Sequence, residues 1–168
     1  MKHKLLIVYY SAVNGNTRRI AEQLQAETGA DIEAIETVKP YTGSHQAIVD
    51  QGLQEVKARL KPDIRPLKQD PKEYDIIAVG TPTWWYTMAP AVRTFLSEHG
   101  WAGKTVVLFQ THGGWPGHTL QDMKALCKGA KFVHPMQVQF DSTGGAELIT
   151  PQEEIDAWTS AVRMSVIQ

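Results

Sequence analysis

Short apolar segments that alternate with helix-patterned segments are the feature of this sequence that most constrains its fold. Three of them are almost continuously apolar: residues 5–10, 74–80 and 104–110. Strands of that kind are covered on both faces, as in a parallel sheet with helices above and below it. A further segment at 31–36 is weaker. A fifth, at 131–140, is interrupted by Pro135, which favours an edge strand or two short pieces.

The segments between the strands place apolar residues three and four positions apart, the spacing of a helix with one buried face. The predicted faces are Ile20, Ala21, Leu24 and Thr28; Val49, Leu53, Val56 and Leu60; Val92, Phe95 and Leu96; Leu120, Met123 and Cys127; and Ile155, Trp158, Val162 and Val166. Gly29 ends the first helix, Ser44 caps the second and Pro90 begins the third. A capping box at Thr150 and Glu153 begins the last helix.

Strands and helices that alternate in this way predict a doubly wound α/β fold with right-handed crossovers. At 168 residues, 42% of them hydrophobic, the chain is long enough for one well-buried core and short for two domains. We therefore expect one domain over residues 1–168. In such folds ligands bind beyond the carboxyl ends of the strands, so function is sought in the segment after each strand.

The charge and residue counts argue against several classes of function. With 17 basic and 18 acidic side chains the net charge is −1, so no chain-wide field attracts nucleic acid or an anionic membrane. The apolar run at residues 5–10 is too short for a signal-peptide core or a membrane span, which predicts a cytoplasmic protein. The lone cysteine, Cys127, fits a reducing compartment and a buried thiol. Six dispersed histidines offer no ligand pair, so we expect no metal site.

The segment after the first strand, residues 11–17, reads SAVNGNT and leads directly into a helix. Backbone N–H groups and the positive end of the helix dipole then converge on one point, which suits a phosphate. The candidate residues are Ser11, Val13, Asn14, Gly15, Asn16 and Thr17. The segment lacks the lysine of a nucleoside triphosphate loop and the three glycines of a dinucleotide fingerprint. The alternative is an ordinary turn beside which Arg18 and Arg19 are solvated.

Two further loops are rich in aromatic residues or glycine. The loop after the third strand supplies Thr81, Pro82, Thr83, Trp84, Trp85 and Tyr86, and the loop after the fourth supplies Thr111, His112, Gly113, Gly114 and Trp115. Adjacent tryptophans in a loop are costly to leave in water, so a planar ligand would explain both. The alternative is that one covers the core and the other is exposed. His112 either tunes a bound ring by its protonation or is solvated. Together with the anion site, these loops describe a flat ring that carries a phosphate, as in flavin mononucleotide (FMN).

These motifs resemble those of the flavodoxin family, in particular the branch that carries GNT after the first strand and P-x-WW after the third. The matching residues are Tyr9, Tyr10, Ser11, Gly15, Asn16, Thr17, Ala21 and Leu24, then Pro82, Trp84 and Trp85, then Thr111, Gly113 and Gly114. The resemblance covers about residues 4–130 with the spacing between motifs preserved. One departure is that three residues, rather than the usual two, separate Ser11 from Gly15.

The resemblance implies a five-stranded parallel sheet of order 2-1-3-4-5 with helices on both faces. It also implies non-covalent FMN, with the phosphate on the 11–17 loop and the ring between the 81–86 and 111–116 loops. On that analogy the ring carries the redox chemistry and the two loops tune it. No catalytic acid or base is then expected.

Two functions from different classes remain open: an electron carrier that uses FMN, and an NAD(P)H-dependent FMN oxidoreductase that reduces a quinone, an azo compound or free flavin. Carriers of this family are usually strongly acidic, so a net charge of −1 weakens the first. No second nucleotide fingerprint supports the second. We favour the carrier, with a redox protein or a small-molecule electron acceptor as its partner. Residues 40–73 and 141–150 have no assigned role, although residues 141–145 could form either a lid or a plain surface turn.

Overall fold

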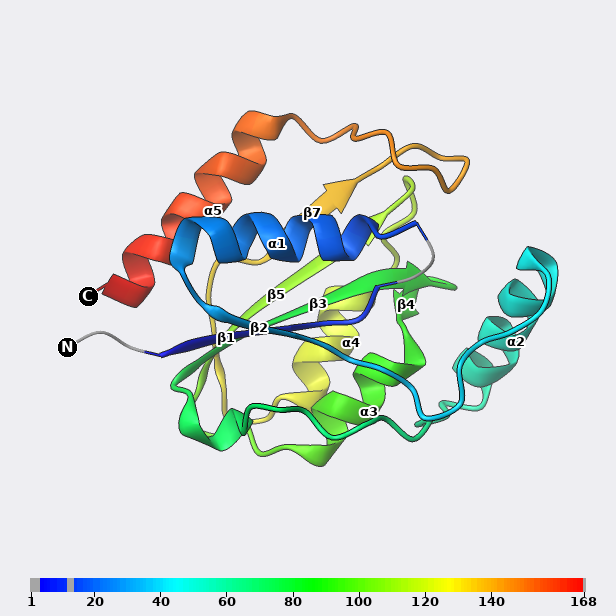
Figure 1. Ribbon diagram of the computed structural model, residues 1–168, viewed down its shortest axis with the longest axis horizontal. Helices are drawn as coiled ribbons and strands as arrows, with labels where there is room; N and C mark the ends of the chain where they lie inside the picture. Colours follow the sequence, from blue (N-terminus) through cyan, green and yellow to red (C-terminus); the bar gives the residue numbers. More distant parts are fainter. Residues whose placement is uncertain (1–3, 12–13, 168) are drawn as a thin grey trace.

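A computed structural model describes residues 4–11 and 14–167, and a single parallel sheet forms its centre (Figure 1). The strand order along the sheet is β2-β1-β3-β5-β6. These strands are β1 (Leu5–Tyr9), β2 (Asp31–Ala34), β3 (Ile76–Trp84), β5 (Thr105–His112) and β6 (Lys131–Phe132). The predicted α/β fold with this order of neighbours is confirmed.

The sheet has seven strands where five were predicted, because the fifth is divided into the two short pieces given as an alternative and one short strand, β4, was not foreseen. Pro135 and the positive φ of 49° at His134 divide the fifth strand into β6 and β7 (Met136–Gln139), and both pieces pair with β5. The other addition is β4 (Thr87–Met88), which pairs antiparallel with the end of β3. Proline cannot donate a ladder hydrogen bond, which accounts for the break.

Helices cover both faces of the sheet, as Figure 1 shows. On one face lie α1 (Asn16–Thr28) and α5 (Gln152–Ile167), and on the other lie α3 (Pro90–Glu98) and α4 (Thr119–Leu126). A turn of 3₁₀ helix, η1 (Pro71–Glu73), precedes β3. Gly29 ends α1 at a φ of 69° and Pro90 is the first residue of α3, as predicted. Among the described residues, no helix combines the length and apolar content that crossing a bilayer requires.

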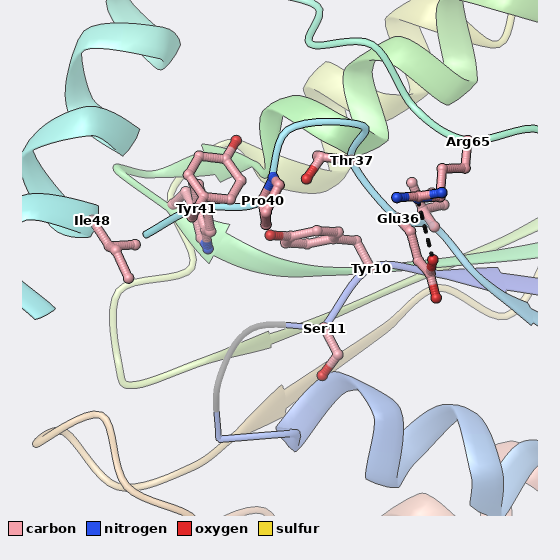
Figure 2. A pocket seen from close by; sticks show the side chains of 10 residues that line it. Tyr10, Ser11, Glu36, Thr37, Pro40, Tyr41, Ile48 and Arg65 are labelled. Atoms are coloured by element: carbon pink, nitrogen blue, oxygen red, sulfur yellow. Dashed lines mark ion pairs between the residues drawn. The ribbon is translucent and has the colours of Figure 1, made fainter. Parts of the chain in front are cut away.

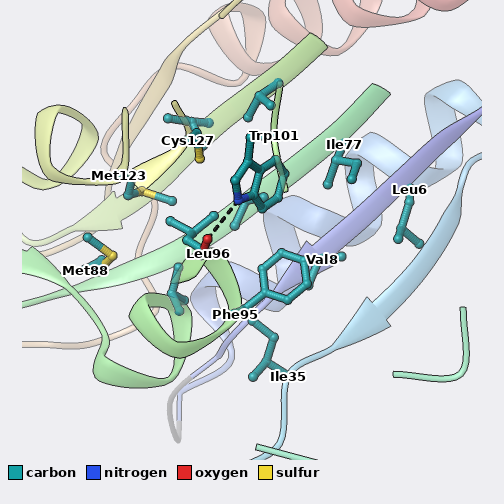
Figure 3. Close-up of a cluster of buried hydrophobic side chains, with 14 of the residues drawn as sticks. Leu6, Val8, Ile35, Ile77, Met88, Phe95, Leu96, Trp101, Met123 and Cys127 are labelled. Carbon is teal, nitrogen blue, oxygen red and sulfur yellow. Dashed lines mark hydrogen bonds between the residues drawn. The ribbon is translucent and has the colours of Figure 1, made fainter. Parts of the chain in front are cut away.

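Each face of the sheet has its own core, because successive side chains of a strand point to opposite sides. Along β1, Leu6 and Val8 pack toward α3 and α4, whereas Leu5 and Ile7 pack toward α1 and α5. Figure 3 shows the first core, in which Trp101 Nε1 donates to the carbonyl of Leu96 at 2.8 Å. Each fully buried aliphatic or phenyl side chain stabilises the fold by about 1.5–3 kcal/mol. The two cores fix the strand ends that carry the site.

The helix α2 (His45–Lys57) lies apart from the sheet, beyond its carboxyl edge (Figure 1). The predicted cap is confirmed, since Ser44 Oγ accepts from the N–H of Ala47 at 3.1 Å. The predicted apolar face is confirmed only in part: Val49, Leu53 and Val56 lie on the less exposed side of α2 but are half-buried, and Leu60 lies beyond the helix end at 45% exposure. The residues that α2 buries are Gly52 and Glu55. The helix therefore packs on a small area rather than along a stripe.

The start of α5 also differs from the prediction. Thr150 Oγ1 accepts from the N–H of Gln139 at 2.7 Å, so this hydroxyl ties the segment to β7. The helix begins at Gln152, after Pro151. The predicted capping box is thus replaced by a contact with the sheet.

Candidate functional site

The carboxyl ends of β1, β3 and β5 meet at one edge of the sheet and bring the three predicted loops together. Thr17 Oγ1 and Thr111 Oγ1 are 2.8 Å apart, although 94 residues separate them in the sequence. Thr83 Oγ1 donates to the carbonyl of Thr111 at 2.9 Å. Parallel strands end on the same side, so residues distant in sequence converge at this edge as expected.

The N-terminus of α1 presents its first N–H groups without a charged cap. Gly15 precedes the helix at a φ of 71°, offers no side chain to cap it, and the first turn contains no acidic residue. Neutral oxygens make the local contacts: Asn14 Oδ1 accepts from the N–H of Asn16 at 3.3 Å, and Ser11 Oγ from that of Arg18 at 3.2 Å. The positive end of the helix dipole therefore has no carboxylate of the protein in that turn, which suits an anion. Ala12 and the predicted Val13 lie outside the described residues.

The segment after Gly80 is a strand and hairpin, not the loop that was predicted. β3 continues to Trp84 and returns through β4, with Trp85 and Tyr86 at the tip. Both tip residues have positive φ, 51° and 69°. Two-residue hairpins of this kind favour Asn and Gly, so bulky side chains here store strain of about 1–3 kcal/mol each. A backbone hydrogen bond holds the tip in place, because the N–H of His118 donates to the carbonyl of Tyr86 at 2.9 Å.

Trp84 and Trp85 occupy different environments. Trp84 is half-buried, and its indole makes edge-to-face contacts with the rings of Tyr10 and Tyr41 at centroid distances of 5.8 and 5.1 Å. Trp85 is 42% exposed, and its Nε1 donates to the carbonyl of Val49 at 3.2 Å. The alternative that one tryptophan covers the core therefore applies to Trp84.

A cavity of about 440 Å³ opens between the hairpin, α2 and the turn before α1. Its lining comprises Asn14, His45, Ile48, Val49, Gly52, Thr83, Trp84, Trp85 and Gly144. This volume lies within the range of about 300–1,000 Å³ that small-molecule sites occupy. Three of the predicted site residues on the hairpin thus face one cavity together with the predicted Asn14. The contribution of α2 was not predicted.

Some predicted residues also serve the scaffold. Thr81 is fully buried, and its hydroxyl accepts from the N–H of Ala89 at 3.0 Å and donates to the carbonyl of Pro82 at 2.8 Å. Thr17 and Thr111 are also buried, at 1% and 4% exposure. Each hydroxyl carries one proton, so Thr17 can still donate outward if it accepts from Thr111.

The loop after β5 is the more open side of the site. His112 Nδ1 accepts from the N–H of Gly114 at 3.0 Å, and burial lowers the pKa of this imidazole below its ordinary value. Both observations fit a neutral ring at pH 7. Gly114 has a φ of 119°, a conformation that favours glycine. Trp115 is 60% exposed and makes the outer rim of this loop.

A fourth segment, residues 141–147, reaches the site and was not assigned to it from the sequence. Its carbonyls accept from three side chains at the start of α1: Asn14 Nδ2 to Gly144 O at 2.8 Å, Asn16 Nδ2 to Gly145 O at 3.0 Å, and Arg19 Nη1 to Ala146 O at 3.2 Å. The segment therefore fixes the side chains of the predicted phosphate loop.

Asp141 organises that segment. Its carboxylate accepts from the hydroxyl and N–H of Thr143 and from the N–H groups of Gly145 and Glu147, at 2.5–3.2 Å. The Thr143 hydroxyl, followed by the N–H groups of Glu147 and Gly145, lowers the pKa of Asp141 to about 2. A Cβ on Gly113 would lie 3.2 Å from the carbonyl oxygen of Asp141, so this segment also packs on the 111–115 loop. The sequence DSTGG signals a tight turn, but nothing local in it indicates these partners.

Comparisons with known proteins agree with this geometry. The family model described as Flavodoxin matches residues 4–150. A proposed flavoprotein from Bacteroides eggerthii is 28% identical, with a TM-score of 0.73 over 95% of this chain and 98% of that one. A proposed flavoprotein from Bacteroides uniformis is 22% identical, with a TM-score of 0.74 over 95% and 99%. A Lactobacillus acidophilus flavoprotein, solved in complex with FMN, is 20% identical, with a TM-score of 0.69 over 94% and 99%.

The last two similarities concern the fold alone. The family match is broader evidence, because it spans most of the chain, from the first strand to the segment that follows β7. The predicted resemblance is thereby confirmed at the level of the family, though not of the branch. This chain belongs to the flavodoxin family.

Proposed function

We propose that this protein transfers electrons through a non-covalently bound FMN. Membership of the flavodoxin family and the FMN complex of the Lactobacillus acidophilus protein support this cofactor. When bound, FMN supplies reversible electron uptake and release by its ring. The protein's own residues then have to hold the phosphate, shelter the ring and leave a route for electrons.

One observation carries the proposal: the N-terminus of α1, which has no acidic cap, adjoins a cavity with two indoles in its wall. Asn14 belongs to both, since it lies in the turn before α1 and lines the cavity of about 440 Å³. We assign the phosphate to residues 14–17, and the ring to Thr83, Trp84, Trp85 and the 111–115 loop. A dianionic group and a flat aromatic ring are what those two neighbouring environments bind best.

The cavity favours electron transfer over acid–base catalysis. Among the described residues that line it, His45 is the one with an ionisable side chain. Electron transfer through the ring needs no protein acid or base, so this lining suffices. The alternative, an NAD(P)H-dependent oxidoreductase, is favoured by the net charge of −1, which gives little steering toward a protein partner. The partner in the proposed function is a redox protein or a small-molecule acceptor.

The first test is the visible spectrum of purified protein, recorded anaerobically before and after addition of NADPH. We expect flavin absorption that NADPH leaves unchanged and that photoreduction bleaches. Bleaching by NADPH, with turnover of a quinone above about 1 per second, would establish the enzyme instead. A colourless protein that also fails to bind added FMN would contradict the proposed cofactor.

The assignment of the phosphate is tested by comparing FMN with riboflavin, which lacks it. Asn14→Asp places a carboxylate at a helix terminus that has no charged cap and should weaken FMN binding about tenfold through charge repulsion. Binding of riboflavin should change by less than about threefold, because its ring and ribityl chain carry no charge. Equal losses for both ligands would mean that the phosphate lies elsewhere.

A further inference from the structure

A second cavity, of about 470 Å³, lies on the other side of Trp84, toward β1 and β2 (Figure 2). It shares Trp84 and Ile48 with the first cavity, so one indole and one aliphatic side chain separate the two. Figure 2 shows the ring of Tyr10 between the Glu36–Arg65 pair at one end and Tyr41 with Ile48 at the other. Ser11 of the predicted phosphate loop also lines this space, but the positions proposed above for the phosphate, at residues 14–17, and for the ring leave it free.

The hydroxyl of Tyr10 is the first polar group available to an occupant. Within the described part of the chain this hydroxyl makes no hydrogen bond, although the ring is half-buried and lines the cavity. Burial, with a smaller effect from Glu55, raises the pKa of Tyr10 to about 12, so the group remains a neutral donor. Tyr41 is different, because its hydroxyl already donates to Glu55 Oε1 at 2.6 Å.

Arg65 provides a second donor at the other end of the cavity. Its Nε lies 3.7 Å from Glu36 Oε2, and both side chains are largely exposed, at 63% and 69%. Such a surface pair is worth about 0–1 kcal/mol, so the guanidinium can turn to a ligand at little cost. The backbone beneath is fixed, since the N–H of Arg65 donates to the carbonyl of Glu36 at 2.8 Å.

The walls between these donors are aromatic and aliphatic. The rings of Tyr10 and Tyr41 both meet the indole of Trp84 edge-on, and Ile48 closes the space beside them. Edge-to-face aromatic walls favour a flat ring as occupant. Glu55 is not open to an occupant, because its two carboxylate oxygens already accept from Tyr41 and Gln51.

We propose that this second cavity binds a planar ring compound with a hydrogen-bond-accepting oxygen at each end, with Tyr10 Oη donating to one oxygen and Arg65 to the other. The occupant lies one indole away from the cofactor cavity. That position suits an electron acceptor. The role of electron acceptor rests on the proposed function, whereas the binding of the ring compound does not depend on it.

Binding is tested on the full chain saturated with oxidised FMN, so that no turnover occurs. The probe is 2-methyl-1,4-naphthoquinone, and 2-methylnaphthalene, which has the rings without the oxygens, is its matched control. Binding is followed by the indole ¹H–¹⁵N resonances, with that of Trp84 assigned from Trp84→Phe. We expect the quinone to bind with a dissociation constant below about 1 mM, and the hydrocarbon at least about tenfold more weakly.

Two variants remove the donors singly. Tyr10→Phe and Arg65→Gln should each weaken quinone binding about threefold to tenfold. Their matched controls, Tyr9→Phe and Arg163→Gln, should leave it unchanged: Tyr9 packs on the opposite face of the sheet, and Arg163 pairs with Glu27 on α1. Thermal melting and FMN affinity of each variant establish that it is folded. Mass spectrometry verifies that the buried Cys127 forms no adduct.

Three results would overturn the proposal: no binding of the quinone, equal binding by wild type and both donor variants, or competition between quinone and FMN for one cavity. Failure of the proposed function looks different. A protein that takes up no FMN, yet binds the quinone in a manner sensitive to Tyr10 and Arg65, would retain this site and lose the electron-transfer role.

Discussion

The two walls of the cavity that we propose for the cofactor are held by different forces. On one side, the 141–147 segment is joined to the start of α1 by hydrogen bonds from amide and guanidinium groups to backbone carbonyls. On the other side, Trp84 packs against the rings of Tyr10 and Tyr41 and against Gly52 of α2. We call these the polar wall and the aromatic wall.

This difference indicates that the polar wall is more rigid than the aromatic wall. Hydrogen bonds need donors and acceptors within a few tenths of an ångström, so the polar wall holds one geometry, and the loss of one partner affects the others. Ring packing is less directional, and α2 contacts the rest of the fold over a small area, so the aromatic wall can shift slightly and remain packed. Changes in the polar wall should therefore act on cofactor affinity with little loss of stability, whereas changes in the aromatic wall, which also contributes to the proposed ring site, should lower the stability as well.

The largest expected effect is that of Trp84→Ala. It removes the indole on which Tyr10, Tyr41 and α2 pack and leaves a void, so the free energy of unfolding should fall by about 2–4 kcal/mol. Urea unfolding of the apoprotein measures this. The matched control is Trp115→Ala, which removes an indole that is 60% exposed and should change the stability by less than about 0.5 kcal/mol. Equal losses from the two variants would contradict the packing role of Trp84.

Thr17→Ala tests the junction of the two loops. It removes a hydroxyl that contacts Thr111 and can donate to the phosphate, so FMN affinity should fall by about tenfold. Thr17→Ser, which keeps the hydroxyl, should recover most of the loss. Thr111→Val removes only the internal partner and should reduce stability more than FMN affinity. Unchanged FMN binding in Thr17→Ala would remove Thr17 from the site.

Asp141→Asn tests the polar wall without touching the cavity. Asparagine keeps the size, but its NH₂ group faces the N–H donors of residues 143–147, so the segment loosens its hold on Asn14 and Asn16. FMN affinity, measured by fluorescence titration, should fall about threefold to tenfold. Asp156→Asn, which alters an exposed carboxylate on α5, is the control and should have no effect. An equal loss of FMN affinity in Asp156→Asn would show that the effect comes from the change of charge alone.

The effect of Asp141→Asn on FMN affinity should depend on pH. The pKa of Asp141 lies at about 2 in the folded protein, below its ordinary 3.8, so ionised Asp141 stabilises the segment above about pH 4 and that contribution is lost as the pH falls through about 2. The difference in FMN affinity between wild type and Asp141→Asn should therefore stay constant from about pH 7 to 5 and narrow below about pH 4. If the difference in FMN affinity vanished near pH 6, a group other than Asp141 would be responsible for it.

Local signals in the sequence were sufficient for most of the fold. Gly29 and Pro90 define helix ends through their own backbone preferences, and the apolar runs identify strands that are buried on both faces. The aromatic residues of this wall were identified from the sequence, but their segment was predicted to be a loop. Pro82 is unusual inside a strand, so the sequence does not indicate that β3 continues to Trp84. The pairing of Thr83 with Met88 and of Trp84 with Thr87 reveals the hairpin.

The polar wall could not be predicted in the same way. Asn14 and Gly144 are 130 residues apart, and neither carries a local signal for the other. Thr81 shows the same limit: its burial and its hydrogen bond to the N–H of Ala89 depend on where β4 returns, which the sequence around it does not indicate. Contacts between distant segments decide both cases, and a single sequence does not contain them.

The smallest and sharpest test substitutes one glycine in each wall. A Cβ on Gly145 would lie 2.6 Å from Asp141 Oδ2, and that carboxylate is fixed by several hydrogen bonds, so Gly145→Ala should reduce FMN affinity about twofold to fivefold. A Cβ on Gly52 would lie 3.2 Å from Trp84 Cε3, a contact that a small shift of α2 relieves. Alanine also favours the helix by about 1 kcal/mol, so Gly52→Ala should leave the free energy of unfolding within about 1 kcal/mol of wild type. A greater loss in Gly52→Ala would show that the aromatic wall is as rigid as the polar one, and the contrast between them would fail.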